Sequence, residues 1–296
     1  MVRRSPMALK SVRLAIPSAL RRLRQRPTLA ICSLVLLLVG LCTLWPGLFT
    51  RADPYAVNIE KRLRPPSSEH WFGTDDFGRD LFSRVVYGAR TSLGASLVVV
   101  AVAASVGTLL GALAGFARGS LDDLIMRTTD LMISFPLFIM AMVIVAVLGR
   151  NITNAVIAGV IIWWAQYARL VRGNVLSTRE QPYIEAARVV GGSPARILLR
   201  HVLPNSVAPV IVKASLDIGQ VLLVITGLSF IGLGAQPPAA EWGAMVTIGR
   251  KFLFDSWWYP TMPGLAIFVT SLSFNLLGDE LVMLLDPRLR SAVRNA

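Results

Sequence analysis

Six long apolar stretches constrain the fold of this 296-residue chain more than any other feature. A helix needs about 20 mainly apolar residues to cross a bilayer, because each residue adds about 1.5 Å. Hydrophobic residues make up 54% of the chain and charged residues 16%, so the apolar surface exceeds what a soluble core of this size can bury. We therefore predict an all-α membrane protein with six transmembrane helices. The predicted spans cover residues 29–49, 93–116, 131–148, 153–171, 207–233 and 261–278.

Basic residues are distributed unevenly between the connecting segments, and this predicts the orientation in the membrane. Residues 1–28 contain eight Lys or Arg residues and no acid, whereas seven basic residues in 50–92 are nearly balanced by six acids. Cytoplasmic segments of membrane proteins hold the excess of Lys and Arg. Both termini are therefore predicted in the cytoplasm, with 50–92 outside. The net charge of +13 then reflects orientation, and we predict no nucleic-acid partner.

Three glycines in the second span predict close helix packing. Gly107, Gly111 and Gly115 are spaced four residues apart and so share one helix face. Helices in lipid associate through close approach of their backbones over small residues, because lipid supplies no hydrophobic drive between them. We expect this glycine face to pack against another helix of the chain or of a partner.

Two ionisable residues lie within the fifth span. Lys213 and Asp217 are four residues apart and can pair along one helix face. Because charges are costly in a membrane, they usually face a bundle interior or a water-filled path. One interpretation is a pair that lines or gates a pore. The other, which the sequence favours, is a neutral structural pair near the cytoplasmic end, with Lys213 extending to the interface.

The sequence contains no group of residues typical of catalysis or metal binding. The only histidines, His70 and His201, fall in different connecting segments, and Cys32 and Cys42 share one apolar stretch. The G-x-x-x-x-G-K-[ST] motif of a P-loop is missing as well. We therefore predict that the chain is not an enzyme, binds no ATP of its own and holds no metal.

The connecting segment 174–206 predicts two short helices. Pro182 can begin the first helix, and Gly191-Gly192 can end it through a positive φ. A second helix is expected from Pro194 until Leu203-Pro204 breaks it. A helix pair tied between two spans disfavours DNA binding. It suits docking into a groove on a cytoplasmic partner.

The order of residues in this segment also matches a known pattern. Glu185-Ala186-Ala187 is followed by Gly191 and then by Leu203-Pro204. This order resembles the EAA loop of permease subunits of binding-protein-dependent ABC importers. His201, two residues before Leu203, resembles the variant found in the peptide-importer branch.

Three other segments extend the resemblance to residues 29–290. Residues 70–93, 229–244 and 284–290 are similar to segments of dipeptide, oligopeptide and nickel permeases. The chain departs from that branch at Val282-Met283, where an Arg-Asp pair is usual. This departure puts a cytoplasmic polar contact at that point in doubt.

The resemblance implies a type I ABC importer permease fold. In this family two permease subunits form the pore, two cytoplasmic ATPases close on ATP, and an external binding protein delivers the substrate. The EAA helix sits in a cleft of one ATPase and couples its closure to opening of the pore. Carried over to this chain, the ATPase-coupling residues are Glu185, Ala186, Ala187, Gly191, Gly192, His201, Leu203 and Pro204.

The resemblance also implies partners, cargo and location. ATP and Mg²⁺ are expected on the partner ATPases, with no cofactor on this chain, and the second permease subunit is expected to be non-identical. Di- or oligopeptides are the expected cargo, with nickel or another small solute as the alternative, in a bacterial inner membrane. A secondary transporter without an ATPase is less favoured, because matched broken helices in two halves are not visible.

These inferences divide the chain into segments. They are a basic cytoplasmic segment 1–28, a first helix 29–49, an extracytoplasmic loop 50–92, a permease domain 93–285 that contains the EAA loop, and a cytoplasmic tail 286–296. Aromatic residues before the sixth span, Trp257-Trp258-Tyr259, predict an interfacial belt. Trp71 and Trp242 are candidates for contact with the binding protein.

Overall fold

The computed structural model describes residues 27–117 and 119–285. Almost all of the predicted basic segment and the whole predicted tail lie outside these ranges. Within them the regular structure is helical, apart from one isolated bridge between Thr74 and Asp80. The long helices are α2 (Pro27–Leu44), α3 (Leu81–Ala117), α4 (Ser120–Ser134), α5 (Leu137–Leu148), α6 (Ile152–Arg179), α9 (Leu203–Phe230) and α11 (Trp258–Leu285). The short ones are α7 (Pro182–Val189), α8 (Pro194–Ile197), a π-helical turn (Leu198–Val202), α10 (Trp242–Gly249) and 3₁₀ turns at Pro46–Leu48, Ile59–Lys61 and Arg250–Phe252. The predicted all-α fold is confirmed.

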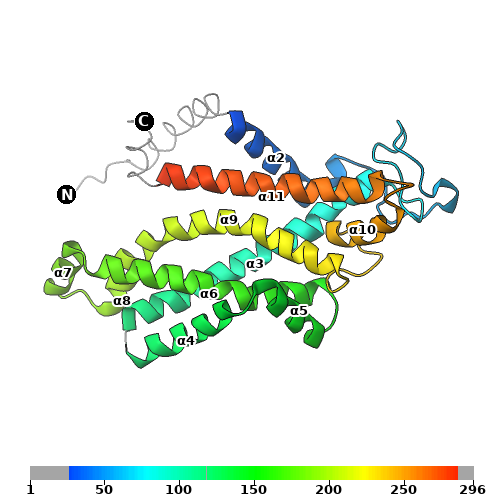
Figure 1. Ribbon diagram of the computed structural model, residues 1–296. Helices are drawn as coiled ribbons and strands as arrows, with labels where there is room; N and C mark the ends of the chain where they lie inside the picture. The colour runs from blue at the N-terminus through cyan, green and yellow to red at the C-terminus, as the bar shows by residue number, and fades with distance from the viewer. Residues whose placement is uncertain (1–26, 118, 286–296) are drawn as a thin grey trace.

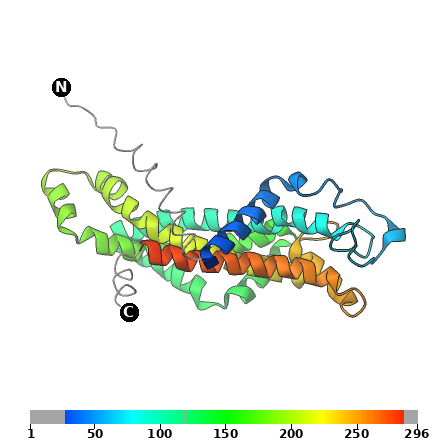
Figure 2. The same ribbon diagram turned by 90° about the horizontal axis from the view of Figure 1, so that it is seen from above.

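The long helices lie side by side in an elongated bundle (Figure 1). α9 lies between α11 and α6, and α3 packs against both α6 and α9. α2 runs obliquely across the bundle and contacts α3 and α11 (Figure 2). The largest apolar cluster joins α3, α5, α6 and α9 and includes Val99, Trp163 and Ile225. One end of the bundle carries α7 and α8, and the other carries α10 and residues 49–80. These are called the α7 end and the α10 end below.

Among the described residues, five helices are long and apolar enough to cross a bilayer, and α4 with α5 supplies a sixth apolar segment. The axes of α4 and α5 are bent by 96°, so the prediction of one continuous helix over 131–148 is wrong. Pro136 explains the break. It has no N–H to donate and it forces the residue before it into an extended conformation. Phe135 accordingly has φ −87° and ψ 143°.

α3 begins at Leu81 rather than at residue 93, where the second span was predicted to start. Asp80 explains the early start, because its Oδ2 accepts hydrogen bonds from the backbone N and the Oγ of Ser83, both at 2.8 Å. Such a cap satisfies N–H groups that have no partner within the helix. The 37 residues of α3 make it about 55 Å long, against about 30 Å of bilayer hydrocarbon. Its first turns therefore extend beyond the apolar layer at the α10 end.

α9 follows the π-helical turn without interruption, so the predicted helix break at Leu203-Pro204 is wrong. Pro204 lies in the first turn of α9. A proline is tolerated there because the N–H groups of a first turn lack helical acceptors. The Leu-Pro pair therefore marks the start of the long helix.

The glycine face of α3 lies against α6 within the same chain. A Cβ added at Gly107 would lie 2.4 Å from the carbonyl oxygen of Trp164, and one at Gly111 would lie 2.3 Å from that of Ala168. A Cβ at Gly115 would lie 2.9 Å from the side chain of Val175. The two helix backbones are therefore as close as residues without side chains permit.

Candidate functional site

The segment between α6 and α9 protrudes as a helix pair at the α7 end (Figure 1). Its underside is apolar. Ile184 of α7 is fully buried, and Ile197 and Val202 are buried beside it. They pack with Val171 and Val175 of α6. This cluster fixes the helix pair to the bundle, so α7 is held in place by side chains as well as by its connections.

Two glycines shape the turn between α7 and α8. Gly191 has φ +85°, a conformation that residues with a Cβ rarely adopt. The N–H of Gly191 donates to Arg188 O and that of Gly192 to Ala187 O, both at 2.9 Å. A Cβ at Gly192 would lie 2.7 Å from that oxygen of Ala187. The turn is therefore tight, and Ser193 follows it with its Oγ accepting from Arg196 N at 3.4 Å.

The outer face of α7 is exposed. Glu185 and Ala186 lie on this face, and Val189 and Val190 at its end are 87% and 88% exposed. Small side chains beside one acid leave room for another protein to approach the helix closely. Two adjacent exposed valines make the end of this face apolar.

Further hydrogen bonds tie the helix pair to the long helices. Asn205 of α9 donates through Nδ2 to Tyr183 Oη at 3.0 Å and to the carbonyl oxygen of His201 at 2.6 Å. Arg179, at the end of α6, donates through Nη1 to Gly115 O at 3.0 Å and to Phe116 O at 3.3 Å. The last carbonyl groups of a helix receive no hydrogen bond from an N–H group of the same helix. Arg179 supplies donors to two of these carbonyls and so caps the end of α3.

A polar cluster lies between α6 and α9, away from both ends of α9. The ammonium of Lys213 donates to Asp217 Oδ1 at 3.0 Å and to Gln166 Oε1 of α6 at 2.9 Å. The same Nζ lies 5.4 Å from the ring centroid of Tyr167. The predicted ion pair is thus present, with two additional partners from α6.

The α10 end is built on a network of buried ions. Asp75 is fully buried and accepts from the backbone N of Phe77 and of Arg79, both at 2.9 Å. Its Oδ2 also accepts from Arg79 Nε at 2.6 Å and lies 3.3 Å from Arg84 Nε. Arg84 donates further to the carbonyl oxygens of Pro54, at 2.9 Å, and Pro238, at 3.3 Å. The network joins residues 49–80 to α3 and to the segment before α10.

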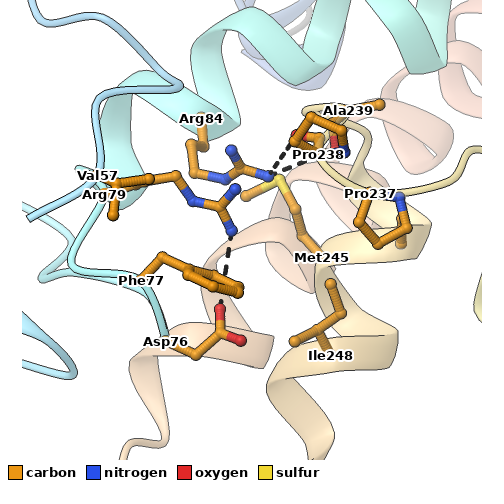
Figure 3. Close-up of a pocket in the computed structure, with 11 residues that line it drawn as sticks. Val57, Asp76, Phe77, Arg79, Arg84, Pro237, Pro238, Ala239, Met245 and Ile248 are labelled. Atoms are coloured by element: carbon orange, nitrogen blue, oxygen red, sulfur yellow. Dashed lines mark hydrogen bonds and ion pairs between the residues drawn. The ribbon is translucent and has the colours of Figure 1, made fainter. Parts of the chain in front are cut away.

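A cavity of about 540 Å³ lies beside this network (Figure 3). Asp76, Phe77 and the two arginines line one side, and Pro237, Pro238, Met245 and Ile248 line the other. The guanidinium of Arg79 lies 4.8 Å from the ring centroid of Phe77. The cavity therefore lies between residues 57–84 on one side and residues 237–248 on the other.

Glu241 and Trp242 fix α10 to α3. Glu241 Oε2 accepts from Ala244 N at 2.7 Å and Oε1 from Ser92 Oγ at 2.9 Å, so Glu241 caps α10. Burial raises the pKa of Glu241, and these hydrogen bonds oppose that shift. The indole Nε1 of Trp242 donates to Val85 O at 2.8 Å. Trp242 therefore has a structural role.

The predicted aromatic belt is wrong for two of its three residues. Trp258 and Tyr259 are buried, and only Trp257 is exposed. Tyr259 Oη donates to Asp76 Oδ1 at 2.8 Å, and Trp258 Nε1 donates to Thr74 O at 3.4 Å. Both side chains therefore hold the segment before α3 against the start of α11.

Comparison with known proteins shows the family of this chain. A family model described as "Binding-protein-dependent transport system inner membrane component" matches residues 107–291. The chain belongs to this family. It is therefore a multi-pass inner-membrane permease subunit of an ABC importer, in which the ATPase is a separate protein.

Curated relatives match nearly the whole chain. The probable D,D-dipeptide transport system permease protein DdpC of Escherichia coli (strain K12) is 45% identical over 90% of this chain and 89% of the relative. The dipeptide transport system permease protein DppC of Alkalihalophilus pseudofirmus is 44% identical over 85% and 83%. The glutathione transport system permease protein GsiD of Pectobacterium atrosepticum is 43% identical over 95% and 94%.

A solved structure shares the fold. The crystal structure of an amino acid ABC transporter with histidines matches with a TM-score of 0.52, over 67% of this chain and 92% of the other. The two sequences are 19% identical, so this likeness concerns the fold alone.

The structure places Glu185, Ala186, Ala187, Gly191 and Gly192 on the protruding helix pair, His201 in the π-helical turn, and Leu203 and Pro204 at the start of α9. Lys213 and Asp217 lie farther along α9. Sequence reasoning missed Arg179 and Gln166, both polar residues on α6 whose partners lie on other helices. It also missed the buried Asp75. For Asp75 a signal existed, since an acid followed four residues later by an arginine can form a local pair.

Proposed function

We propose that this chain forms half of the translocation pore of an ATP-driven importer for di- or oligopeptides. The names of the relatives support the cargo, because dipeptide, D,D-dipeptide and glutathione systems all transport short peptides by name. Nickel or another small solute is the alternative cargo of the same kind of permease, and the uptake experiment below decides between them.

The coupling element is the helix pair at the α7 end. The observation that carries this proposal is that α7 is anchored underneath by Ile184 while it exposes Glu185 and Ala186. Because α7 is fixed to the bundle, movement of a protein that binds its exposed face is transmitted to the bundle. Here that partner is a cleft on the cytoplasmic ATPase, which the small residues allow to close around the helix. The turn at Gly191-Gly192 and the segment from His201 to Leu203-Pro204 set the angle between this element and α9.

The remaining parts of the transporter follow from this arrangement. Two ATPases hold ATP and Mg²⁺, and this chain holds no cofactor or metal. A second, non-identical permease subunit completes the pore. The α7 end faces the cytoplasm together with both termini. The α10 end faces the external binding protein, and the exposed Trp71 is a candidate contact for it.

The test is reconstitution of the full transporter, with the partner permease, the ATPases and the binding protein, in liposomes. Ala186→Arg places a long charged side chain on the docking face, and we expect it to abolish dipeptide uptake while insertion into the membrane is unchanged. Ser120→Arg, at a position that is also exposed and lies at the start of α4, is the control. Normal uptake with Ala186→Arg would show that α7 does not couple the permease to the ATPase. If the unaltered transporter takes up nickel but no peptide, the proposed cargo is wrong. The proposed coupling role of α7 is not affected by that result.

A further inference from the structure

The face of α9 between α6 and α11 carries polar residues at the depth of the membrane. Lys213 and Gln220 are seven residues apart, which is nearly two helical turns, so they share this face. Gln220 is exposed, and the side chain of Lys213 is 25% exposed. Polar and ionisable groups in membrane helices face a bundle interior or a water-filled path, because exposure to lipid is costly. This face is open in the single chain, so a partner subunit or a water-filled path is expected to lie against it in the assembled transporter.

Three groups contact the ammonium of Lys213. Asp217 and Gln166 accept two of its three donors, and the ring of Tyr167 lies below the ammonium. The third donor has no acceptor in the part of the chain that the structure describes. Asp217 is 4% exposed, so the negative charge lies inside and the positive charge lies on the open side.

The direction of the side chain argues against extension to the membrane interface. Lys213 lies ten residues after the start of α9, about 15 Å along the axis. The nearer interface is at the α7 end. The ammonium instead points toward Asp217, which is one turn farther from that end. The neutral pair of the structural interpretation is present, but the extension of Lys213 to the cytoplasmic interface does not fit this geometry.

We infer that Lys213 is a fixed positive charge on the wall of the translocation path and that it contacts the carboxylate of the transported peptide, an inference that rests on the proposed peptide cargo. One free N–H donor suits this role. A path must bind its cargo well enough to admit it and weakly enough to release it. Asp217 and Gln166 occupy the other donors and so limit the strength of the contact. Gln220, about 10 Å farther along the same face, offers an amide to the peptide backbone.

Thiol labelling tests the charge without requiring transport. In the assembled transporter, with Cys32 and Cys42 replaced by Ser, Gln220→Cys should react with charged water-soluble methanethiosulfonates. Ile211→Cys, exposed on the opposite face of α9 and about 14 Å nearer the α7 end, should not react. The negatively charged reagent should react faster than the positively charged one. Lys213→Met should lower this preference by about twofold or more, as expected for one charge about 10 Å away. Equal reactivity at residues 211 and 220, or a preference unchanged by Lys213→Met, would overturn the inference.

Protection by peptide tests the carboxylate contact. A dipeptide with a free carboxylate should slow labelling of Gln220→Cys more than the same dipeptide with a C-terminal amide, and Lys213→Met should abolish the difference. In uptake assays Lys213→Met should lower peptide transported per ATP hydrolysed by about tenfold, as for loss of one charged hydrogen bond, and Lys213→Arg should retain most of it. Equal protection by the dipeptide with a free carboxylate and by the dipeptide amide would show that Lys213 does not contact the carboxylate. If the unaltered transporter moves no peptide, the proposed cargo is wrong, while the charge preference at residue 220 is still measured.

Discussion

Single glycines set the distance between the two helices that form the centre of the bundle. The carbonyl of Ala168 on α6 occupies the space in which a side chain at Gly111 would lie. The carbonyl of Trp164, one turn earlier on α6, does the same at Gly107. Backbone atoms cannot move aside as a flexible side chain can. The contact therefore depends on the absence of a single methyl group at each position.

Gly111→Ala should lower the stability of the protein by about 1–3 kcal/mol, because α3 and α6 must separate to admit the methyl group. Gly94→Ala on the same helix is the matched control, since nothing lies within 4 Å of its Cβ position. That change should raise stability by about 0.5–1 kcal/mol through helix propensity. Thermal unfolding in detergent measures both. A Gly111→Ala protein as stable as Gly94→Ala would contradict the packing described for this face.

Glu241 links stability to pH. Burial raises its pKa in the folded protein above that of the unfolded chain. Between those two values the folded state binds more protons, so the free energy of unfolding falls as pH rises. Glu241→Gln keeps an oxygen acceptor for Ala244 N and cannot titrate, so its stability should vary less with pH over this range. Unfolding measured from about pH 4 to about pH 8 compares the two proteins. Parallel curves would show that Glu241 is not responsible.

At the scale of elements, the proposed coupling role of α7 requires that this helix be firmly attached to the bundle. Ile184→Ala should remove about 2–5 kcal/mol of packing beneath the helix. We expect ATP hydrolysis by the reconstituted transporter to continue while peptide uptake falls. Val189→Ala, on the exposed side of the same helix, should leave packing unchanged. Uptake by Ile184→Ala equal to that of the unaltered protein would indicate that the anchoring cluster is dispensable.

Hydropathy predicted where apolar helices occur, but it could not predict where they begin, end or bend. The early start of α3 depends on Asp80 and Ser83, which lie in a polar stretch that hydropathy excludes. The bend at Pro136 lies inside an apolar run, where composition gives no warning although the proline itself does. The helix pair around Gly191 was predictable because its caps are local in sequence. The partners of Lys213 on α6 were not, since they depend on which helices become neighbours.

At the scale of the whole molecule, the two ends of the bundle differ in kind. The α7 end presents a small exposed helix, and the α10 end presents a folded segment held by buried ions. This difference supports the proposed orientation, with α7 toward the ATPase.

Impermeant thiol reagents test that orientation directly. In a background without Cys32 and Cys42, Phe254→Cys lies at the α10 end on a residue that is 99% exposed, and Val190→Cys lies at the α7 end. A reagent outside the inner membrane should label Phe254→Cys at once. It should label Val190→Cys only after the membrane is permeabilised. The reverse pattern would invert the orientation of the whole chain.

α3 is attached at both of its ends, and this has a mechanical consequence. Asp80 fixes its first turn within the folded segment at the α10 end, and Arg179 grips its last carbonyls beside the coupling helix. A helix about 55 Å long that is attached to both ends of the bundle can carry a tilt from one end to the other. A tilt of about 5° about one end moves the other by about 5 Å. Under the proposed coupling, a small rotation at the α7 end would displace the α10 end by about the size of an amino-acid side chain.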